Sequence, residues 1–392
     1  MNVLFVNYHD FTSNSAVHIF NLANELEQLG IDCAVCVPDN RRSIKRLGRP
    51  KFAVLDFRDA RAGRVRFADG GDPTIVHPWT PRENVRLVTE ELVRRYGCPY
   101  VVHLEDNEDV ITAHHLDIPV ETMLALPADA LNGRLPAALS HPERARAFLA
   151  RSAGVTVIID RLLEFKPDGL PGEVVWPGYE RELFAPHPPD RRLKRKLRIG
   201  DDEFVAVYHG NSHPTNASEM RSLYLAVAEV NRRGFPLRLV RLGRDFVDFL
   251  GEHRSSVEQH VVSRGYVRRA EVGRYLSLAD VLVQPGRADP FNDYRLPAKL
   301  PEFLAVGRPV VLPASNLGRY LRDGENCLLL YEGDTMEIAG ALERLLADPE
   351  LRERLGRAGR AFAEEHFSWP RSARKLAAFY GRVLDRVGAP TT

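Results

Sequence analysis

The chain of 392 residues carries 54 lysine and arginine residues against 53 aspartate and glutamate residues, and 44% of its residues are hydrophobic. This length exceeds what one hydrophobic core usually serves, so we expect two domains. The balanced charge argues against a dedicated nucleic-acid binder.

The first half alternates short apolar segments with amphipathic ones. Residues 3–6 read as a buried parallel strand, and a polar loop leads to a helix with apolar residues at helical spacing that ends at Gly30. A strand at residues 33–37 completes a βαβ unit. Further strands are predicted at residues 53–55, 74–77, 100–104 and 155–159. The pattern predicts a doubly wound α/β domain.

Four cysteines make no disulfide framework for a chain of this size, which fits a reducing cytoplasm. Cys33 and Cys36 form a CxxC pair inside an apolar run and lack a second ligand pair, so we interpret them as buried strand residues and predict no metal or redox site. The start of the chain reads as a strand, not a signal peptide, and no apolar run is long enough to span a membrane.

The proline-rich residues 174–189 predict a hinge, after which the pattern restarts. Strands are predicted at residues 204–208, 237–242, 261–262, 281–284, 309–312 and 327–330. Helices are predicted at residues 191–198, 217–233 and 370–387. Two such domains would leave a cleft at the carboxyl ends of both sheets.

Residues 289–310 predict a loop followed by an anion-binding helix start. Pro297 suits the first position of a helix that runs to about residue 306 and ends at Gly307, with Arg295 at its mouth. Lys299 in the first turn opposes the helix dipole by roughly 0.3–1 kcal/mol, so an anion is expected to offset it. Glu302 is suited to accepting hydrogen bonds from ribose hydroxyls. A surface helix with an ordinary Lys/Glu pair is the alternative.

Several motifs carry a family resemblance that covers nearly the whole chain. The R-x-P-x-K-x-x-E pattern from Arg295 to Glu302 resembles the nucleotide-sugar loop and helix of retaining GT-B glycosyltransferases of the family 4 type. Supporting segments are residues 176–179, 278–285, 323–329 and 366–369. The resemblance implies two Rossmann-like domains facing each other across a cleft: residues 1–182 joined by a C-terminal helix at 371–392, and residues 183–370 binding the nucleotide sugar.

The resemblance also implies a site and a chemistry. Arg295 and Lys299 would stabilise the departing diphosphate, with no obligatory metal and no protein nucleophile. The remaining predicted nucleotide-sugar contacts are His209, Gly210, Asn211, Asp289, Asn292, Leu300 and Glu302. Gly210 would let backbone amides of residues 209–212 approach phosphate, or it is a simple turn glycine.

The sequence departs from the family pattern twice. Tyr294 stands where many relatives carry a first glutamate, so Asp289, Asn292 or Asp293 would contact the sugar instead. Residues 208–216, after the first strand of the second domain, lack the Arg and Lys that many relatives carry there. The only possible cation in this segment is a histidinium.

His103 follows residues 100–102 at the carboxyl edge of the first predicted sheet. By resemblance it would bond a donor-sugar hydroxyl and stabilise positive charge through its carbonyl; a structural histidine is the alternative. Glu105, Asp106 and Glu108 are candidates for acceptor binding, although a charge run of this kind also suits a solvated loop.

Ten cations lie between Arg41 and Arg66, against two acids. This basic region predicts either peripheral contact of a cytoplasmic protein with an anionic inner membrane surface or a solvated loop. The expected function is sugar transfer from a nucleotide diphosphate donor to a glycan or lipid-linked acceptor. Alternatives are a nucleotide-sugar 2-epimerase and a catalytically inactive nucleotide-sugar-binding relative.

Overall fold

The computed structural model describes residues 1–388, which form two compact units. The first unit runs from Met1 to Pro177 and includes the chain again from Ser368, while the second is Gly178–Phe367. From the sequence, the two domain boundaries are predicted after residues 182 and 370. Residues 389–392 of the predicted C-terminal helix lie outside the described part of the chain.

The first unit is built on a seven-stranded parallel sheet with strand order β3-β2-β1-β4-β5-β6-β7. Its strands are β1 (Asn2–Asn7), β2 (Asp32–Val37), β3 (Ala53–Asp56), β4 (Ile75–Trp79), β5 (Val101–Leu104), β6 (Gly154–Val157) and β7 (Gly172–Val174). Its α-helices are α1 (Asn14–Gln28), α2 (Phe57–Arg61), α3 (Glu83–Tyr96), α4 (Glu108–Leu116), α5 (Val120–Leu124), α6 (Pro142–Ala150) and α14 (Trp369–Gly388).

The second unit repeats this plan with a six-stranded parallel sheet in the order β10-β9-β8-β11-β12-β13. Its strands are β8 (Phe204–His209), β9 (Leu237–Leu242), β10 (Val261–Gly265), β11 (Val281–Val283), β12 (Val310–Pro313) and β13 (Leu328–Leu330). Its α-helices are α7 (Arg191–Lys196), α8 (Ala217–Arg232), α9 (Arg254–Glu258), α10 (Arg269–Leu276), α11 (Lys299–Ala305), α12 (Thr335–Ala347) and α13 (Pro349–His366).

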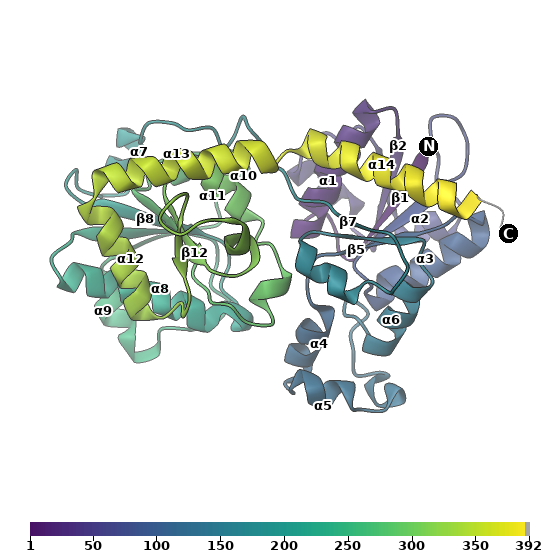
Figure 1. The fold of residues 1–392 in the computed structure, drawn as a ribbon, viewed down its shortest axis with the longest axis horizontal. Helices are drawn as coiled ribbons and strands as arrows, with labels where there is room; N and C mark the ends of the chain where they lie inside the picture. Colours follow the sequence, from purple (N-terminus) through teal and green to yellow (C-terminus); the bar gives the residue numbers. More distant parts are fainter. Residues whose placement is uncertain (389–392) are drawn as a thin grey trace. The chain divides into compact units, whose positions relative to one another are not determined.

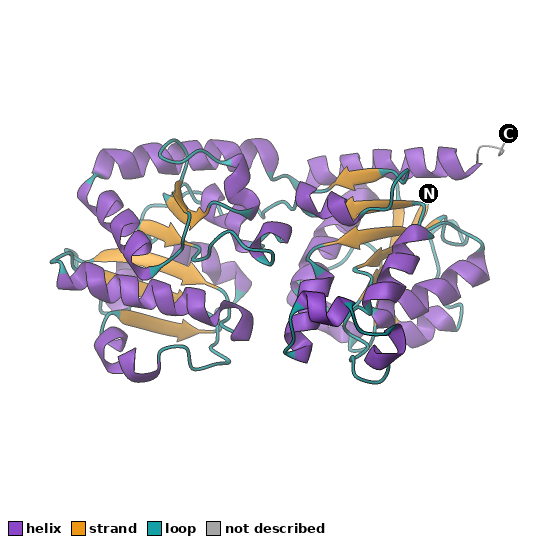
Figure 2. Ribbon diagram, turned by 60° about the horizontal axis from the view of Figure 1, so that its bottom comes forward, coloured by secondary structure: helices purple, strands orange, loops and turns teal. Residues whose placement is uncertain are grey.

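Both sheets have helices on their two faces (Figures 1 and 2) and follow the doubly wound order in which the chain fills one side of the first strand and then the other. The predicted pair of Rossmann-like α/β domains is confirmed. All six residues of β1 are buried, as expected for a strand with helices on both faces. In α1 the side chain of Ser13 caps the helix start by accepting from the Ala16 amide.

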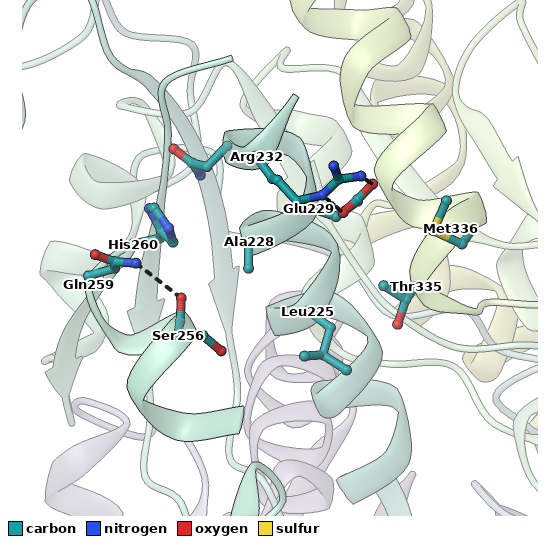
Figure 3. Close-up of a pocket in the computed structure, with 10 residues that line it drawn as sticks. Leu225, Ala228, Glu229, Arg232, Ser256, Gln259, His260, Thr335 and Met336 are labelled. Carbon is teal, nitrogen blue, oxygen red and sulfur yellow. Dashed lines mark hydrogen bonds and ion pairs between the residues drawn. The ribbon is translucent and has the colours of Figure 1, made fainter. Parts of the chain in front are cut away.

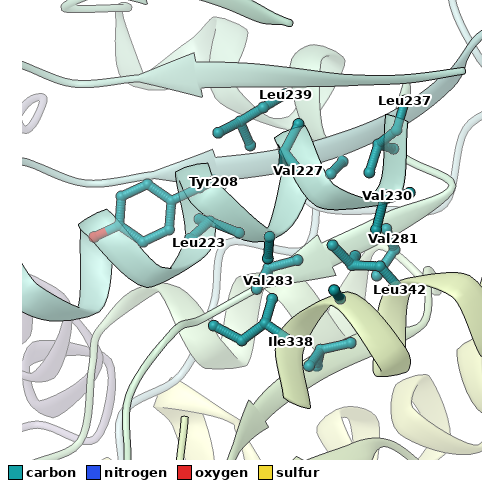
Figure 4. Packing of buried hydrophobic residues seen from close by; sticks show 14 of the residues in the cluster. Tyr208, Leu223, Val227, Val230, Leu237, Leu239, Val281, Val283, Ile338 and Leu342 are labelled. Atoms are coloured by element: carbon teal, nitrogen blue, oxygen red, sulfur yellow. The ribbon is translucent and has the colours of Figure 1, made fainter. Parts of the chain in front are cut away.

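The core of the second unit lies between its sheet and the helices α8 and α12. Leu223 and Val227 of α8 pack with Val283 of β11 and Ile338 of α12 (Figure 4). Tyr208 of β8 belongs to the same cluster, but Figure 4 shows its hydroxyl at the margin of the aliphatic side chains. This margin coincides with the end of β8.

The last helix, α14, packs on the first unit alongside α1 (Figure 1, yellow and purple). The hydroxyl of Tyr380 lies 2.6 Å from Nδ1 of the buried His77. The Trp369 ring lies 5.8 Å from the His18 ring, and the Ser372 hydroxyl donates to the Trp176 carbonyl. The chain therefore returns to its first unit through specific polar contacts as well as an apolar helix face.

Two local expectations were wrong. Residues 172–174 form the edge strand β7, which sequence reasoning missed because none of its three residues is buried. The strand predicted at residues 155–159 ends at Val157, where the chain turns toward a 3₁₀ helix at Asp160–Phe165. Cys33 and Cys36 are buried in β2 as predicted, and burial raises the pKa of both thiols. Within residues 1–388, no helix combines the length and apolarity needed to cross a bilayer.

Candidate functional site

Most of the predicted site residues lie in the second unit, beyond the carboxyl ends of β8 and β11. These two strands are neighbours, and the strands added after each of them extend the sheet in opposite directions. Such a switch point is where open parallel sheets bind ligands. The loop after β8 and the segment between β11 and α11 supply the side chains.

Lys299, Tyr208 and Gly210 form a compact group at the end of β8. The Lys299 ammonium donates to the Tyr208 hydroxyl at 3.0 Å and lies 4.2 Å from the centroid of that ring. Gly210 has φ of 141°, and a Cβ at this position would lie 2.5 Å from Lys299 Nζ. Glycine is therefore required here for the lysine to occupy its position.

Asn292 joins Arg295 to the start of α8. Its side-chain oxygen accepts from Arg295 Nε at 3.0 Å and Nη2 at 2.6 Å, and its amide donates to Glu219 at 2.8 Å. The Arg295 guanidinium also lies over the Phe291 ring at 4.2 Å. Asp289 accepts from the backbone amides of Phe291 and Asn292, so it fixes the loop that carries this group.

Glu302 is buried and has a partner on each carboxylate oxygen. Nε2 of His209 lies 3.0 Å from Oε2, and Nη2 of Arg269 lies 2.6 Å from Oε1. Burial alone would raise the pKa of Glu302, but the charge of Arg269 and the hydrogen bond to His209 lower it. Since each oxygen has two lone pairs, the ionised carboxylate keeps capacity for ligand hydroxyls.

Arg295 and Lys299 donate their hydrogen bonds to neutral groups of the described chain and not to its carboxylates. Their hydrogen bonds within the described structure go to neutral oxygens, the Asn292 amide and the Tyr208 hydroxyl. The carboxylate nearest to Arg295, that of Glu219, lies 3.9 Å away. Within residues 1–388, Arg295 thus has only a long ion pair and Lys299 has none, so both cations are suited to an anionic ligand.

The helix that carries Lys299 begins later than predicted. α11 is Lys299–Ala305, and Pro297 lies in the preceding loop with its carbonyl accepting from the Leu300 amide at 3.0 Å. Leu300 itself is fully buried. Its side chain therefore belongs to the core, and its amide is used within the turn.

The loop of residues 209–212 also differs from expectation. The amides of Gly210 and Ser212 donate to the carbonyls of Leu242, the last residue of β9, and Arg244, so they are not aimed at a ligand. The Asn211 side chain accepts from the Arg244 amide. These bonds tie the loop to the neighbouring strand.

A histidinium at His209, which the sequence allowed at most, is not favoured. Burial lowers the pKa of His209, and the nearby charges of Lys299 and Arg269 lower it further. The hydrogen bond to Glu302 raises this pKa but does not offset the decrease. The neutral imidazole donates Nε2–H to the carboxylate. Arg241 of β9, which the sequence did not reveal, is completely buried; it donates to the Gly210 carbonyl and pairs with Asp245 at 2.8 Å, so its charge is already compensated.

His103 belongs to the first unit, within β5. Its Nδ1 lies 2.8 Å from the Thr156 hydroxyl, its ring stacks on Trp79 at 3.8 Å, and burial lowers its pKa to about 3. Its Nε2 is buried without a hydrogen-bond partner. The carbonyl that was expected to face positive charge accepts from the Thr80 amide at 2.9 Å.

Two of the acidic residues after β5 are buried, not solvated. Glu105 accepts from the Ser15 hydroxyl and from His18; burial alone would raise its pKa, but these bonds lower it to about 2. Glu108 pairs with Arg82. Asp106 and Glu108 nevertheless line a cavity of about 280 Å³ at the carboxyl ends of β5 and β6.

A larger hollow of about 640 Å³ lies elsewhere on the second unit (Figure 3). It is lined by the later turns of α8, the segment before β10 and the start of α12, including Arg232, His260 and Met336. The end of α8 and residues 256–260 precede the amino ends of β9 and β10, whereas parallel sheets bind ligands at the carboxyl ends of their strands. Across residues 1–388, no group of three or more His, Cys, Asp or Glu side chains is arranged to hold a metal ion.

Sequence reasoning missed Tyr208, Glu219, Arg241 and Arg269. Tyr208 and Arg241 belong to strands that read as core segments, and Arg269 begins a helix with no motif. Glu219 alone had a usable signal, because it lies in the first turn of the helix that follows β8.

Comparison with known proteins finds relatives of the second unit and structures that resemble the whole chain. The profile of the family described as "Glycosyl transferases group 1" matches residues 203–348. The chain is 27% identical over 201 residues to "Alpha-D-kanosaminyltransferase" of Streptomyces kanamyceticus, covering 49% of this chain and 50% of that protein. It is 32% identical over 230 residues to "D-inositol 3-phosphate glycosyltransferase" of Actinosynnema mirum, covering 54% and 52%. The matches thus span about half the length of these curated relatives.

Solved structures resemble the chain over nearly its whole length. Anabaena Alr3699/HepE in complex with UDP superposes with a TM-score of 0.74 at 14% identity, covering 97% of this chain and 100% of that one. Sucrose-phosphate synthase from Thermosynechococcus elongatus gives 0.70 at 16% identity, covering 98% and 100%. These neighbours are GT-B proteins. Residues 203–348 therefore resemble the glycosyl transferases group 1 family, and the chain as a whole has the GT-B fold.

Proposed function

We propose that the protein is a glycosyltransferase that moves a sugar from a nucleotide-diphosphate donor to a glycan or lipid-linked acceptor with retention of anomeric configuration. The observation that carries this proposal is the placement of Arg295, Lys299 and Glu302 at the switch point of the second sheet. The match to the group 1 family and structural neighbours solved in complex with UDP and UDP-glucose support a nucleotide-sugar donor.

The proposed chemistry uses charges already in place. Arg295 and Lys299 neutralise the diphosphate as the bond to the sugar breaks, which is the step at which negative charge develops. Glu302 accepts hydrogen bonds from the ribose of the donor. No metal is required in this scheme, because two cations face the leaving group. The acceptor occupies the cavity of the first unit lined by Asp106 and Glu108.

The test is Lys299→Ala assayed with a panel of nucleotide sugars and acceptors. Removing one electrostatic stabiliser of the leaving group is expected to lower transfer by about a hundredfold or more. Lys196→Ala, at an exposed position of α7, is the control and is expected to keep wild-type transfer. If the folded Lys299→Ala variant transfers sugar at nearly the wild-type rate, the assignment as a glycosyltransferase with this site is wrong. Epimerised donor in reactions without acceptor would instead identify an epimerase.

The basic region between Arg41 and Arg66 is a second part of the proposal. Asp59 pairs with Arg41 and Arg64, so these two arginines also serve the fold of the first unit. Arg42 and Arg46 lie exposed in the 3₁₀ helix Arg41–Arg46 and are suited to an anionic lipid surface. Co-sedimentation with vesicles containing phosphatidylserine, but not with phosphatidylcholine alone, is the expected result.

A further inference from the structure

Arg269, the first residue of α10, lies between two carboxylates. Its Nη2 is 2.6 Å from Glu302 Oε1 and 2.5 Å from Glu180 Oε2, and its Nε donates to Glu180 Oε1 at 3.0 Å. The guanidinium also lies 5.0 Å from the centroid of the Phe184 ring. One planar cation thus joins the buried glutamate of the site to the first residues of the second unit.

Glu302 depends on this cation for its charge. The side chain is buried, and an ionised carboxylate in such a place requires a cation or several donors. His209 contributes a hydrogen bond but no charge, since burial lowers its pKa. Lys299 and Arg295 bond neutral groups elsewhere. The positive charge in direct contact with Glu302 is therefore that of Arg269.

Arg269 is itself held firmly. Glu180 binds it through both carboxylate oxygens, and the Glu180 carbonyl accepts from the amides of Leu183 and Phe184, which fold the segment into a turn. The same segment lies so close to α10 that a Cβ at Gly273 would collide with the Leu183 carbonyl. The bidentate pair and this tight packing fix the guanidinium.

We propose that Arg269 is a positioning residue for the nucleotide sugar: it orients the Glu302 carboxylate toward the ribose hydroxyls of the donor, and Glu180 holds Arg269 in that role. This inference rests on the proposed function, because it takes Glu302 as the ribose contact. Arg269 does not touch the reacting atoms. Its effect is confined to recognition of the ribose.

The experiment compares ligands with and without ribose hydroxyls. Binding of ADP, CDP, GDP, UDP and thymidine diphosphate is measured by calorimetry, each beside its 2′,3′-dideoxy counterpart. In the wild type, loss of the hydroxyls that bond a charged carboxylate is expected to weaken the cognate nucleotide about tenfold or more. In Arg269→Met, the cognate nucleotide is expected to bind no better than its dideoxy form, whose own affinity stays at the wild-type level.

If Arg269 had a purely structural role, Arg269→Met would weaken the binding of the cognate nucleotide and of its dideoxy counterpart equally. Arg268→Met is the matched control. Arg268 is the neighbour of Arg269 in the sequence, but its side chain is 80% exposed and pairs with Glu271 on the surface. Should Arg269→Met not fold, Glu180→Gln is expected to reduce the discrimination in the same direction.

The outcomes separate the two proposals. Wild-type protein that binds none of the nucleotides overturns the proposed function together with this inference. Wild-type discrimination that persists unchanged in Arg269→Met, or in Glu180→Gln, overturns the inference and leaves the proposed function standing.

Discussion

Replacing Gly210 by alanine tests whether Lys299 must occupy its observed position. The backbone φ of 141° is unfavourable for any side chain, and the new Cβ would lie 2.5 Å from Lys299 Nζ and 3.1 Å from the Tyr208 hydroxyl. Backbone strain of this kind costs about 1–3 kcal/mol. The ammonium is the end of a flexible side chain, so it moves away by about an ångström, and its bond to Tyr208 is lost.

The expected effect on transfer follows from that displacement. Misplacing a group at the reacting centre by about an ångström costs about a hundredfold in rate, comparable to the loss of an electrostatic stabiliser. Gly234→Ala is the matched control, because Gly234 has φ of 96° but nothing within 4 Å of a new Cβ. Both variants are expected to lose similar stability in urea, and transfer is expected to fall in Gly210→Ala alone.

The assay is donor-dependent transfer at saturating acceptor, with unfolding followed in parallel. In the Lys299→Ala background, Gly210→Ala is expected to cause little further loss, since both changes act through the same ammonium. Equal transfer rates for Gly210→Ala and Gly234→Ala would refute the argument. So would full additivity of the two changes.

Two further predictions concern the first unit. His103 is neutral in the folded state with a pKa of about 3, whereas the unfolded chain protonates near its ordinary value of 6.5, so folding stability falls as pH falls below 6.5. Between pH 7 and pH 5 the loss of folding stability amounts to about 2 kcal/mol. His103→Gln is expected to remove this part of the pH dependence of urea unfolding, and an unchanged pH profile would contradict the prediction. Tyr380→Phe leaves Nδ1 of His77 without its partner and is expected to cost about 1–3 kcal/mol in urea unfolding, whereas Tyr331→Phe at an exposed position should cost nothing measurable.

The fold was predictable because its strands carry a strong local signal. A parallel strand covered on both faces reads as an apolar run, as in β1 and β2, and the helices between such strands show the 3.6-residue period. β7 gave no such signal, because it is a three-residue edge strand whose first residue is exposed. Its pairing with β6 depends on the rest of the sheet being formed.

The candidate site was predictable where its residues are close in sequence. Arg295, Lys299 and Glu302 share one segment, and their spacing alone suggested a common ligand. Tyr208 and Arg269 could not be found in this way, because the first is 91 residues from Lys299 and the second begins a separate helix. Contacts of this range exist only after the sheet has aligned the ends of its strands.

Lys299 is held by an aromatic partner and not by a carboxylate. A salt bridge to a carboxylate would neutralise the lysine, whereas the Tyr208 ring and hydroxyl hold the ammonium and leave its charge uncompensated. A cation over an aromatic ring gains about 0.5–2 kcal/mol, less than several charge-assisted bonds to phosphate oxygens supply together. In the proposed function Lys299 is held by Tyr208 until a diphosphate attracts it, while Arg241 secures the neighbouring loop through the Gly210 carbonyl.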